Sequence, residues 1–151
     1  MQNLGRPQQN APRRTLDQLR AERAWKVVEE VDHWTGKQRD FGRALKKTAT
    51  RIVTAGLGSA LAFIDAKEGV RRVARNANAP LSRGAAAVHD CISDWVLERI
   101  KPDKRTTSYL LAEIIAGDAD LLRRATDESL AFMQWVIRFA DARGWTSEGE
   151  E

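Results

Sequence analysis

The chain has 151 residues and a net charge of +4, with 42% hydrophobic and 30% charged residues. This length and composition predict one soluble globular domain. The sequence lacks the apolar run of about 18 residues that a membrane-spanning helix needs, and its polar first fourteen residues do not form a secretory signal. One cysteine excludes an intrachain disulfide and fits a reducing compartment, so the sequence predicts a cytoplasmic protein without membrane contact.

The charge is distributed unevenly along the chain. Residues 41–89 contain nine Lys and Arg against two acids, a net charge of +7, whereas residues 1–40 carry +2 and residues 90–151 carry −5. A basic middle segment beside an acidic C-terminal third is typical of a protein that binds a polyanion through one face.

Apolar residues recur at helical spacing through most of the chain, and runs of β-branched residues are few. This pattern predicts an all-α, single-domain bundle of about six helices. Residues 1–14 are expected to form a disordered leader, residues 15–146 the bundle, and residues 147–151 an acidic tail.

The first predicted helix opens with a capping box at Thr15 and Gln18, whose side chains satisfy free backbone N–H groups, and ends at Thr35-Gly36. Its expected core face is Leu16, Leu19, Ala24, Val27, Val31 and Trp34. The second helix, about 37–55, is expected to bury Phe41, Ala44, Leu45, Ala49, Ile52 and Val53. Gly56-Leu57-Gly58 then forms a tight junction, which we interpret as a helix C-cap. A nucleotide-binding loop is disfavoured, because the junction follows a helix and lacks a third glycine and an acidic partner.

The third helix is predicted from near Ser59 to about Arg75, followed by a loop from Asn76 to Arg83. Its apolar residues are Leu61, Phe63, Ile64 and Val70. The fourth helix, about 84–100, is ended by Pro102, and a short fifth helix, about 107–116, ends at Gly117. The fourth helix presents Val88, Cys91, Ile92, Trp95, Val96 and Ile100.

Asp118 is the predicted N-cap of a last helix over 119–143, with Gly144 just past its end. This helix is apolar on two sides. One side holds Leu122, Ala125, Met133, Val136, Ile137 and Ala140, and the other holds Phe132, Trp135 and Phe139. Such a helix is either central in a bundle or uses its second apolar side to contact another protein, and we favour the central position.

Two blocks of the sequence resemble those of a known family. The first is Gly56-Leu57 followed by Ala60-Leu61-Ala62-Phe63, after a basic amphipathic helix, and the second is the segment from Ser129 to Ala142 with its Ala-x-x-Phe-x-x-Trp-x-x-Arg-Phe-Ala rhythm. Both are similar to the small helical subunit of the Cmr complex, the type III-B CRISPR RNA-guided effector. The chain departs from that family at Ala55, where the family often has Asn, and in its leader and its 76–83 loop.

The resemblance implies a helical subunit with no enzymatic activity of its own and no cofactor, acting in antiviral defence. It implies that several copies line the effector beside the guide RNA and target RNA. They would lie between the Cas10-type large subunit and the repeating backbone subunits.

A basic stripe runs along the second predicted helix. It consists of Arg39, Arg43, Lys46, Lys47 and Arg51. No acid lies between Asp40 and Asp65, so we expect no salt bridge within the helix to neutralise these cations. Uncompensated cations in a row neutralise phosphates without reading bases, which suits an RNA-guided complex whose specificity comes from base pairing. The alternative is a solvated basic face that only aids solubility.

A second, weaker set of candidate RNA-binding residues follows on the third predicted helix, where Glu68 is expected to pair with Arg71 or Arg72. The set is Lys67, Arg71, Arg72 and Arg75. Among the tryptophans, Trp34, Trp95 and Trp135 are expected to pack in the core, while Trp25 and Trp145 are candidates for exposed contacts.

One alternative function is a metal-dependent phosphohydrolase of the HD type, suggested by the dipeptide His89-Asp90. Such a site needs further ligands, for which only His33, Asp94 and Asp118 or Asp120 are available, and the surrounding sequence does not match an HD motif. Cys91 is expected to be a small core residue and not a nucleophile. We therefore predict no catalytic residue and no metal site.

The other alternative is a helical DNA-binding regulator, with the glycine junction at Gly56 as the turn of a helix-turn-helix. The following segment, Leu57–Ile64, is apolar and lacks side chains that read bases, which argues against this function.

Overall fold

The computed structural model describes residues 12–68, 80–105 and 108–147, and over these residues it contains helices and no strand. The elements are α1 (Leu16–Asp32), α2 (Gln38–Ala55), α3 (Leu57–Glu68), α4 (Ala86–Ile100), the short 3-10 helix η2 (Pro102–Lys104), α5 (Leu110–Ala116) and α6 (Ala119–Ala142). They pack around one shared hydrophobic core. The predicted all-α, six-helix bundle is confirmed. No helix in the described ranges is long and apolar enough to cross a membrane.

Several helix ends form where the sequence predicts them. The backbone N–H of Gln18 donates to Thr15 Oγ1 at 3.0 Å and the N–H of Thr15 donates to Gln18 Oε1 at 2.7 Å, completing the capping box of α1. Asp118 Oδ1 accepts from the N–H of Leu121 at 2.9 Å and caps α6. Gly56 ends α2 with φ +97°, and its N–H donates to Ile52 O at 2.9 Å. The C-cap interpretation of this junction is therefore confirmed.

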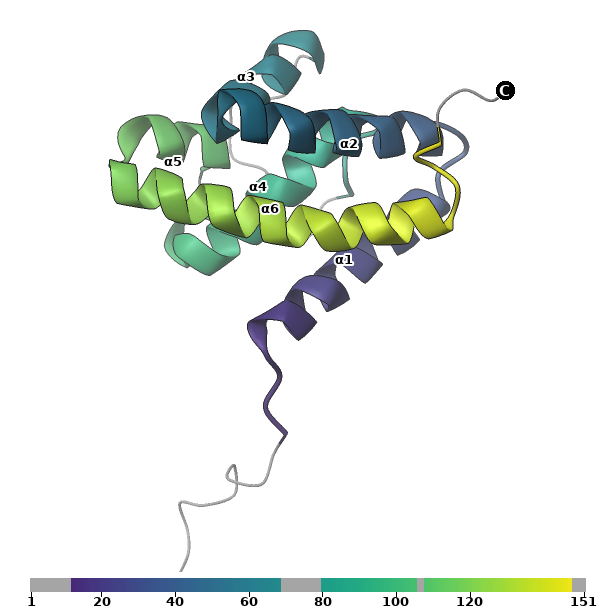
Figure 1. Cartoon of the computed structure of the whole chain (residues 1–151), viewed down its shortest axis with the longest axis horizontal. Helices are drawn as coiled ribbons and strands as arrows, with labels where there is room; N and C mark the ends of the chain where they lie inside the picture. Colours follow the sequence, from purple (N-terminus) through teal and green to yellow (C-terminus); the bar gives the residue numbers. More distant parts are fainter. Residues whose placement is uncertain (1–11, 69–79, 106–107, 148–151) are drawn as a thin grey trace, which may run out of the picture.

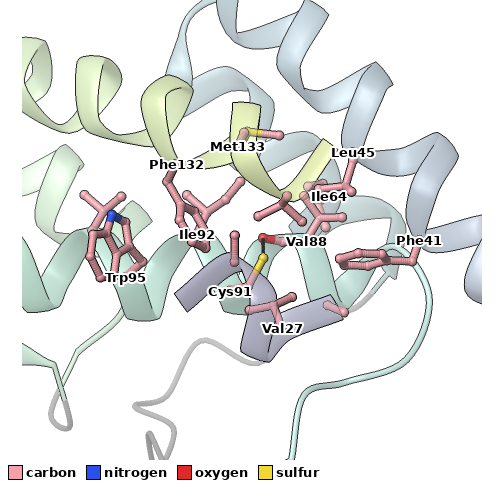
Figure 2. Close-up of a cluster of buried hydrophobic side chains, with 14 of the residues drawn as sticks. Val27, Phe41, Leu45, Ile64, Val88, Cys91, Ile92, Trp95, Phe132 and Met133 are labelled. Atoms are coloured by element: carbon pink, nitrogen blue, oxygen red, sulfur yellow. Dashed lines mark hydrogen bonds between the residues drawn. The ribbon is translucent and has the colours of Figure 1, made fainter. Parts of the chain in front are cut away.

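Helix α6 lies at the centre of the bundle. It contacts α1, α2, α3, α4 and α5, and Figure 1 shows it running beside α2, with α1 crossing on its other side. Figure 2 shows Phe132 and Met133 of α6 in the same core cluster as Ile92 of α4 and Leu45 of α2, with Phe132 beside Ile92. Phe132 is completely buried and Met133 is 1% exposed. The predicted central position of this helix is confirmed.

Some residues of the predicted apolar faces lie at the surface. Val53 is 72% exposed and Phe63 is 45% exposed, and Leu16 and Leu122 are also exposed. Val53, Phe63 and Leu122 each neighbour a buried residue and are exposed because consecutive positions on a helix point about 100° apart, and Leu16 lies in the exposed first turn of α1. Val28 is buried although it was not expected to be.

Trp145 is also buried, at 7% exposure, so its predicted role as an exposed contact is wrong. Beyond α6 the chain turns at Gly144, with φ +77°, and brings the Trp145 ring to a centroid distance of 6.5 Å from Phe41 of α2. The turn is held where the Thr146 hydroxyl donates to Asp141 Oδ1.

The other predicted helix ends either differ from the observed ends or lie outside the described residues. Helix α3 begins at Leu57, two residues earlier than predicted, and α4 begins at Ala86, two residues later. The predicted end of the third helix, with Val70, lies in residues 69–79, outside the described residues, as do most of the expected leader and acidic tail.

Candidate nucleic-acid interface

The basic stripe lies on the solvent side of α2. The opposite side buries Phe41, Leu45 and Ile52 at intervals of four and seven residues, which is the repeat of one helix face. The same geometry leaves the four cations Arg39, Arg43, Lys46 and Lys47 exposed and Arg51 half-buried. The structure thus brings together all five members of the stripe.

Ion pairing within the stripe differs from the prediction. Arg43 Nη1 lies 3.7 Å from Asp40 Oδ1, one turn earlier on α2, and Lys46 Nζ lies 3.5 Å from Asp141 Oδ1 on α6. The expectation of no salt bridge within the helix is therefore wrong for Arg43, because Asp40 at the start of α2 is within reach. Both pairs are exposed, so they are weak and screened by salt. Across the part of the chain that the structure describes, Arg39 and Lys47 have no carboxylate oxygen within 4.0 Å.

Arg51 marks the edge of the stripe next to α3. Its Cζ lies 3.6 Å from the centroid of the Phe63 ring. Phe63 is one of the apolar residues of the third predicted helix, but the apolar residues that α3 buries are Leu57, Ala60, Leu61 and Ile64, and Phe63 lies beside them. The buried positions of α3 are three or four residues apart, which is the repeat of one helix face, and Phe63 does not fit this repeat.

Two shallow depressions lie along the stripe, each lined in part by its cations. One is lined by Lys46, Lys47, Thr50, Arg51 and Thr54. The other, at the start of α2, is lined by Lys37, Gln38, Arg39, Asp40 and Trp145. Cations therefore border both depressions, at the two ends of α2.

The second candidate set is only partly described. Lys67 lies exposed in the last turn of α3. Arg71, Arg72 and Arg75 lie outside the described residues, so the predicted continuation of the basic surface stays a prediction.

The tryptophans divide as predicted, apart from Trp145. Trp34 and Trp95 are buried, and Trp135 is half-buried. Trp25 is 44% exposed, and its ring packs edge-on against Phe139 with centroids 5.2 Å apart. Trp25 thus remains a surface residue, on α1 and not on the basic face of α2.

The dipeptide His89-Asp90 lies inside the bundle. His89 is 2% exposed, its Nε2 has no hydrogen-bond partner among the described residues, and burial lowers its pKa despite the nearby carboxylates of Asp90 and Asp65. Asp90 Oδ2 accepts from the backbone N–H of Ser82 at 2.9 Å. His33 is exposed instead, with Nδ1 2.8 Å from Glu29 O. Within the described residues, no three His, Cys, Asp or Glu side chains are grouped so that they could hold a metal ion.

Cys91 and the glycine junction at Gly56 are also parts of the fold and not functional sites. Cys91 is buried, and burial raises the pKa of its thiol well above the usual range, so it is a poor nucleophile. A helix-turn-helix needs a turn of three or four residues, whereas the single residue Gly56 separates α2 from α3.

A comparison with protein families then decides between these readings of the sequence. The model of the family described as CRISPR-associated protein (Cas_Cmr5) matches residues 16–143, which include all six α-helices and both blocks that carry the resemblance. The chain belongs to the Cmr5 family. Members of the Cmr5 family are small, non-catalytic subunits of the type III-B Cmr CRISPR complex. Membership in the Cmr5 family therefore decides against the phosphohydrolase and DNA-regulator functions.

Proposed function

We propose that this Cmr5 subunit holds the backbone of RNA in the effector through the basic stripe of α2. The observation that carries the proposal is the exposed row of cations, in which Arg39 and Lys47 have no carboxylate within 4.0 Å in the described ranges. The ion pairs of Arg43 and Lys46 are exposed, so phosphate oxygens can replace their carboxylates at little cost. From Arg39 to Arg51 the stripe spans about 18 Å along the helix.

The chemistry of the stripe suits a contact with RNA that does not depend on the base sequence of the RNA. Lys and Arg side chains that neutralise phosphates release condensed counterions, and they carry no information about the bases. About three such contacts give a slope near −2 in a plot of log K against log salt, at about −0.7 per contact for a single strand. One subunit with so few contacts binds weakly.

We propose that the partners in the cytoplasm are the guide RNA paired with its target RNA, the Cas10-type large subunit, the backbone subunits of the Cmr complex, and further copies of this chain. Copies arranged along one RNA raise the affinity through multivalency, because each bound copy holds the strand near the next. In this proposal Lys67, and with it Arg71, Arg72 and Arg75, extends the surface beyond α2.

The test compares two doubly charge-reversed variants with the same change in net charge. In one, Arg39→Glu and Lys47→Glu reverse two exposed cations of the stripe that have no carboxylate within 4.0 Å in the described ranges. In the control, Arg123→Glu and Arg124→Glu reverse two exposed arginines on α6 that are not part of the stripe. Each variant is assembled into the effector, and capture of several target RNAs of unrelated sequence is measured across a range of salt concentrations.

We expect the stripe variant to weaken capture of every RNA by a similar factor and to flatten the salt dependence. The control should bind RNA nearly as the unchanged protein does, and both variants should assemble and keep similar melting temperatures. If the stripe variant assembles and captures RNA as tightly as the control, the stripe is a solvated face and the subunit acts through protein contacts alone.

A further inference from the structure

The contact between Arg51 and Phe63 fixes how the guanidinium lies. Cζ lies 3.6 Å from the ring centroid. This is the usual spacing between two stacked planar groups, so the guanidinium lies flat on the ring. One face of the cation is then covered by Phe63. Arg51 is also one of the residues that line the depression along α2.

The other residues of this depression surround Arg51 with groups that suit a nucleotide. Lys46 and Lys47 supply two ammonium groups, and Thr50 and Thr54 supply hydroxyl and methyl groups. The Thr54 hydroxyl donates to Thr50 O at 3.0 Å, which leaves its oxygen as an acceptor. Phosphate binding uses the ammonium groups but has no use for an aromatic ring, and yet Phe63, which contacts Arg51 at the edge of the depression, is 45% exposed.

We infer that this depression, the Arg51 subsite, binds one unpaired nucleobase of single-stranded RNA, stacked on the flat guanidinium that Phe63 supports. Unpaired bases stack on arginine planes and on aromatic rings, and every base has the flat face that such a stack needs. Lys46 and Lys47 lie beside the stack, where they contact the phosphates of the same nucleotide. The inference rests on the proposed RNA contact of the stripe and adds a base contact to it.

Phe63 acts in this subsite by positioning Arg51. A free arginine side chain samples many rotamers, and a guanidinium that is already stacked loses less conformational freedom when a base covers its second face. The subsite therefore depends on two features that a simple cation does not have, a planar head group and an aromatic support. Arg51→Lys removes the first and keeps the charge, and Phe63→Leu removes the second and keeps an apolar side chain.

The experiment is an NMR titration of the full chain at low salt, which detects even millimolar binding. Two short single-stranded RNAs are used, one with all its bases and one in which the central nucleotides are abasic, so that the phosphates are the same. The unchanged protein is compared with Arg51→Lys and Phe63→Leu. The control is Val53→Ala, which shortens an exposed apolar residue of α2 near Arg51 in the sequence.

We expect the unchanged protein to bind the base-bearing RNA at least about fivefold more tightly than the abasic RNA, the lower end of the effect of one stacked base. Phe63 ring signals should shift only with the base-bearing RNA. Arg51→Lys and Phe63→Leu should each remove this preference and leave the affinity for abasic RNA unchanged. Val53→Ala should keep the preference.

Two results would overturn the Arg51 subsite. One is a preference for the base-bearing RNA that survives both substitutions, and the other is an equal loss on both RNAs in Arg51→Lys, which would make Arg51 a phosphate ligand only. Either result leaves the backbone role of the stripe intact. Failure of the unchanged chain to bind either RNA would contradict the backbone role as well. Because Arg51→Lys keeps Phe63, it tests the inference even if Phe63→Leu does not fold.

Discussion

Gly42 is the point of closest approach between α2 and the C-terminal turn. A Cβ at this position would lie 2.3 Å from the backbone oxygen of Trp145, whereas a Cβ at Gly58 would meet only Ile114 Cγ2 at 3.7 Å, an ordinary contact. We expect Gly42→Ala to lower the free energy of unfolding by about 1–3 kcal/mol, because the turn must move away from α2. Gly58→Ala, also within a helix, should be neutral or stabilising by up to about 1 kcal/mol. Urea denaturation of both variants checks this, and equal stability of the two would contradict it.

Glu128 joins three helices through one buried carboxylate. It is 9% exposed and accepts from Arg20 Nε at 2.7 Å, Arg20 Nη2 at 2.9 Å and Trp95 Nε1 at 2.8 Å. Burial acts to raise the pKa of Glu128, but these hydrogen bonds outweigh burial and lower it. The carboxylate thus connects α6 to α1 and α4 as a charged group.

We expect Glu128→Ala to destabilise the protein by about 2–3 kcal/mol. This is less than the 3–5 kcal/mol of a fully buried pair, because Arg20 keeps part of its exposure to water. The matched control is Asp120→Ala, which breaks the exposed ion pair with Arg123 on the same helix and should change stability little. Thermal unfolding followed by circular dichroism measures both variants, and similar losses in the two would show that the Glu128 network contributes no more than a surface pair.

The apolar side of α6 that holds Phe132, Trp135 and Phe139 is unevenly buried. Phe132 is completely buried, whereas Trp135 and Phe139 are half-buried. Trp135 is also tied to α1, because its Nε1 donates to Asp17 Oδ1 at 3.0 Å. Phe132, which stacks on Trp95 of α4, therefore lies in the core, whereas Trp135 and Phe139 pack at its edge against α1.

Among the aromatic residues of α6, we expect Phe132→Ala to have the largest effect, about 3–5 kcal/mol, the usual cost of removing a fully buried phenylalanine. Phe139→Ala should cost clearly less, because its ring already contacts water. Chemical denaturation of the two variants gives the order. If Phe139→Ala is the more destabilising, the contact between α1 and α6 is more important than the core contact with α4.

The free energy of unfolding of the whole protein should decrease in acid. The pKa of His89 is lowered in the folded state by burial, so the unfolded chain binds a proton more readily. The contribution of neutral His89 is present above the usual histidine pKa of about 6.5 and is lost as the pH falls below it. Glu128, whose folded pKa is also lowered, adds a loss at lower pH, as the pH falls through its folded pKa.

We therefore expect the melting temperature to fall from pH 7 toward pH 5 and to fall further in stronger acid. His89→Leu should flatten the first part of this fall, since it removes the buried group that takes up the proton. The second part, where Glu128 is protonated, should remain. Melting curves of both proteins across this range test the assignment, and parallel curves from pH 7 to pH 5 would show that His89 is not responsible.

Much of this molecule follows from local sequence patterns. Apolar spacing predicted the six helices, the capping residues Thr15 and Asp118 located two helix starts, and the acid-poor run after Asp40 located the basic face of α2. These features depend on hydrogen bonds and side-chain directions within a few residues, so they need no knowledge of the neighbouring helices. The family resemblance was likewise carried by two short blocks, and the family match confirmed it.

Only the tertiary structure decided the features that depend on contacts distant in sequence. Trp145 is buried because the turn after α6 folds back onto Gly42, and Lys46 finds Asp141 because α6 lies beside α2. Phe63 supports Arg51 because α3 leaves its ring outside the core, next to the edge of α2. In each case the partner lies on another element, and the spacing of residues along one helix does not indicate which surface will face it.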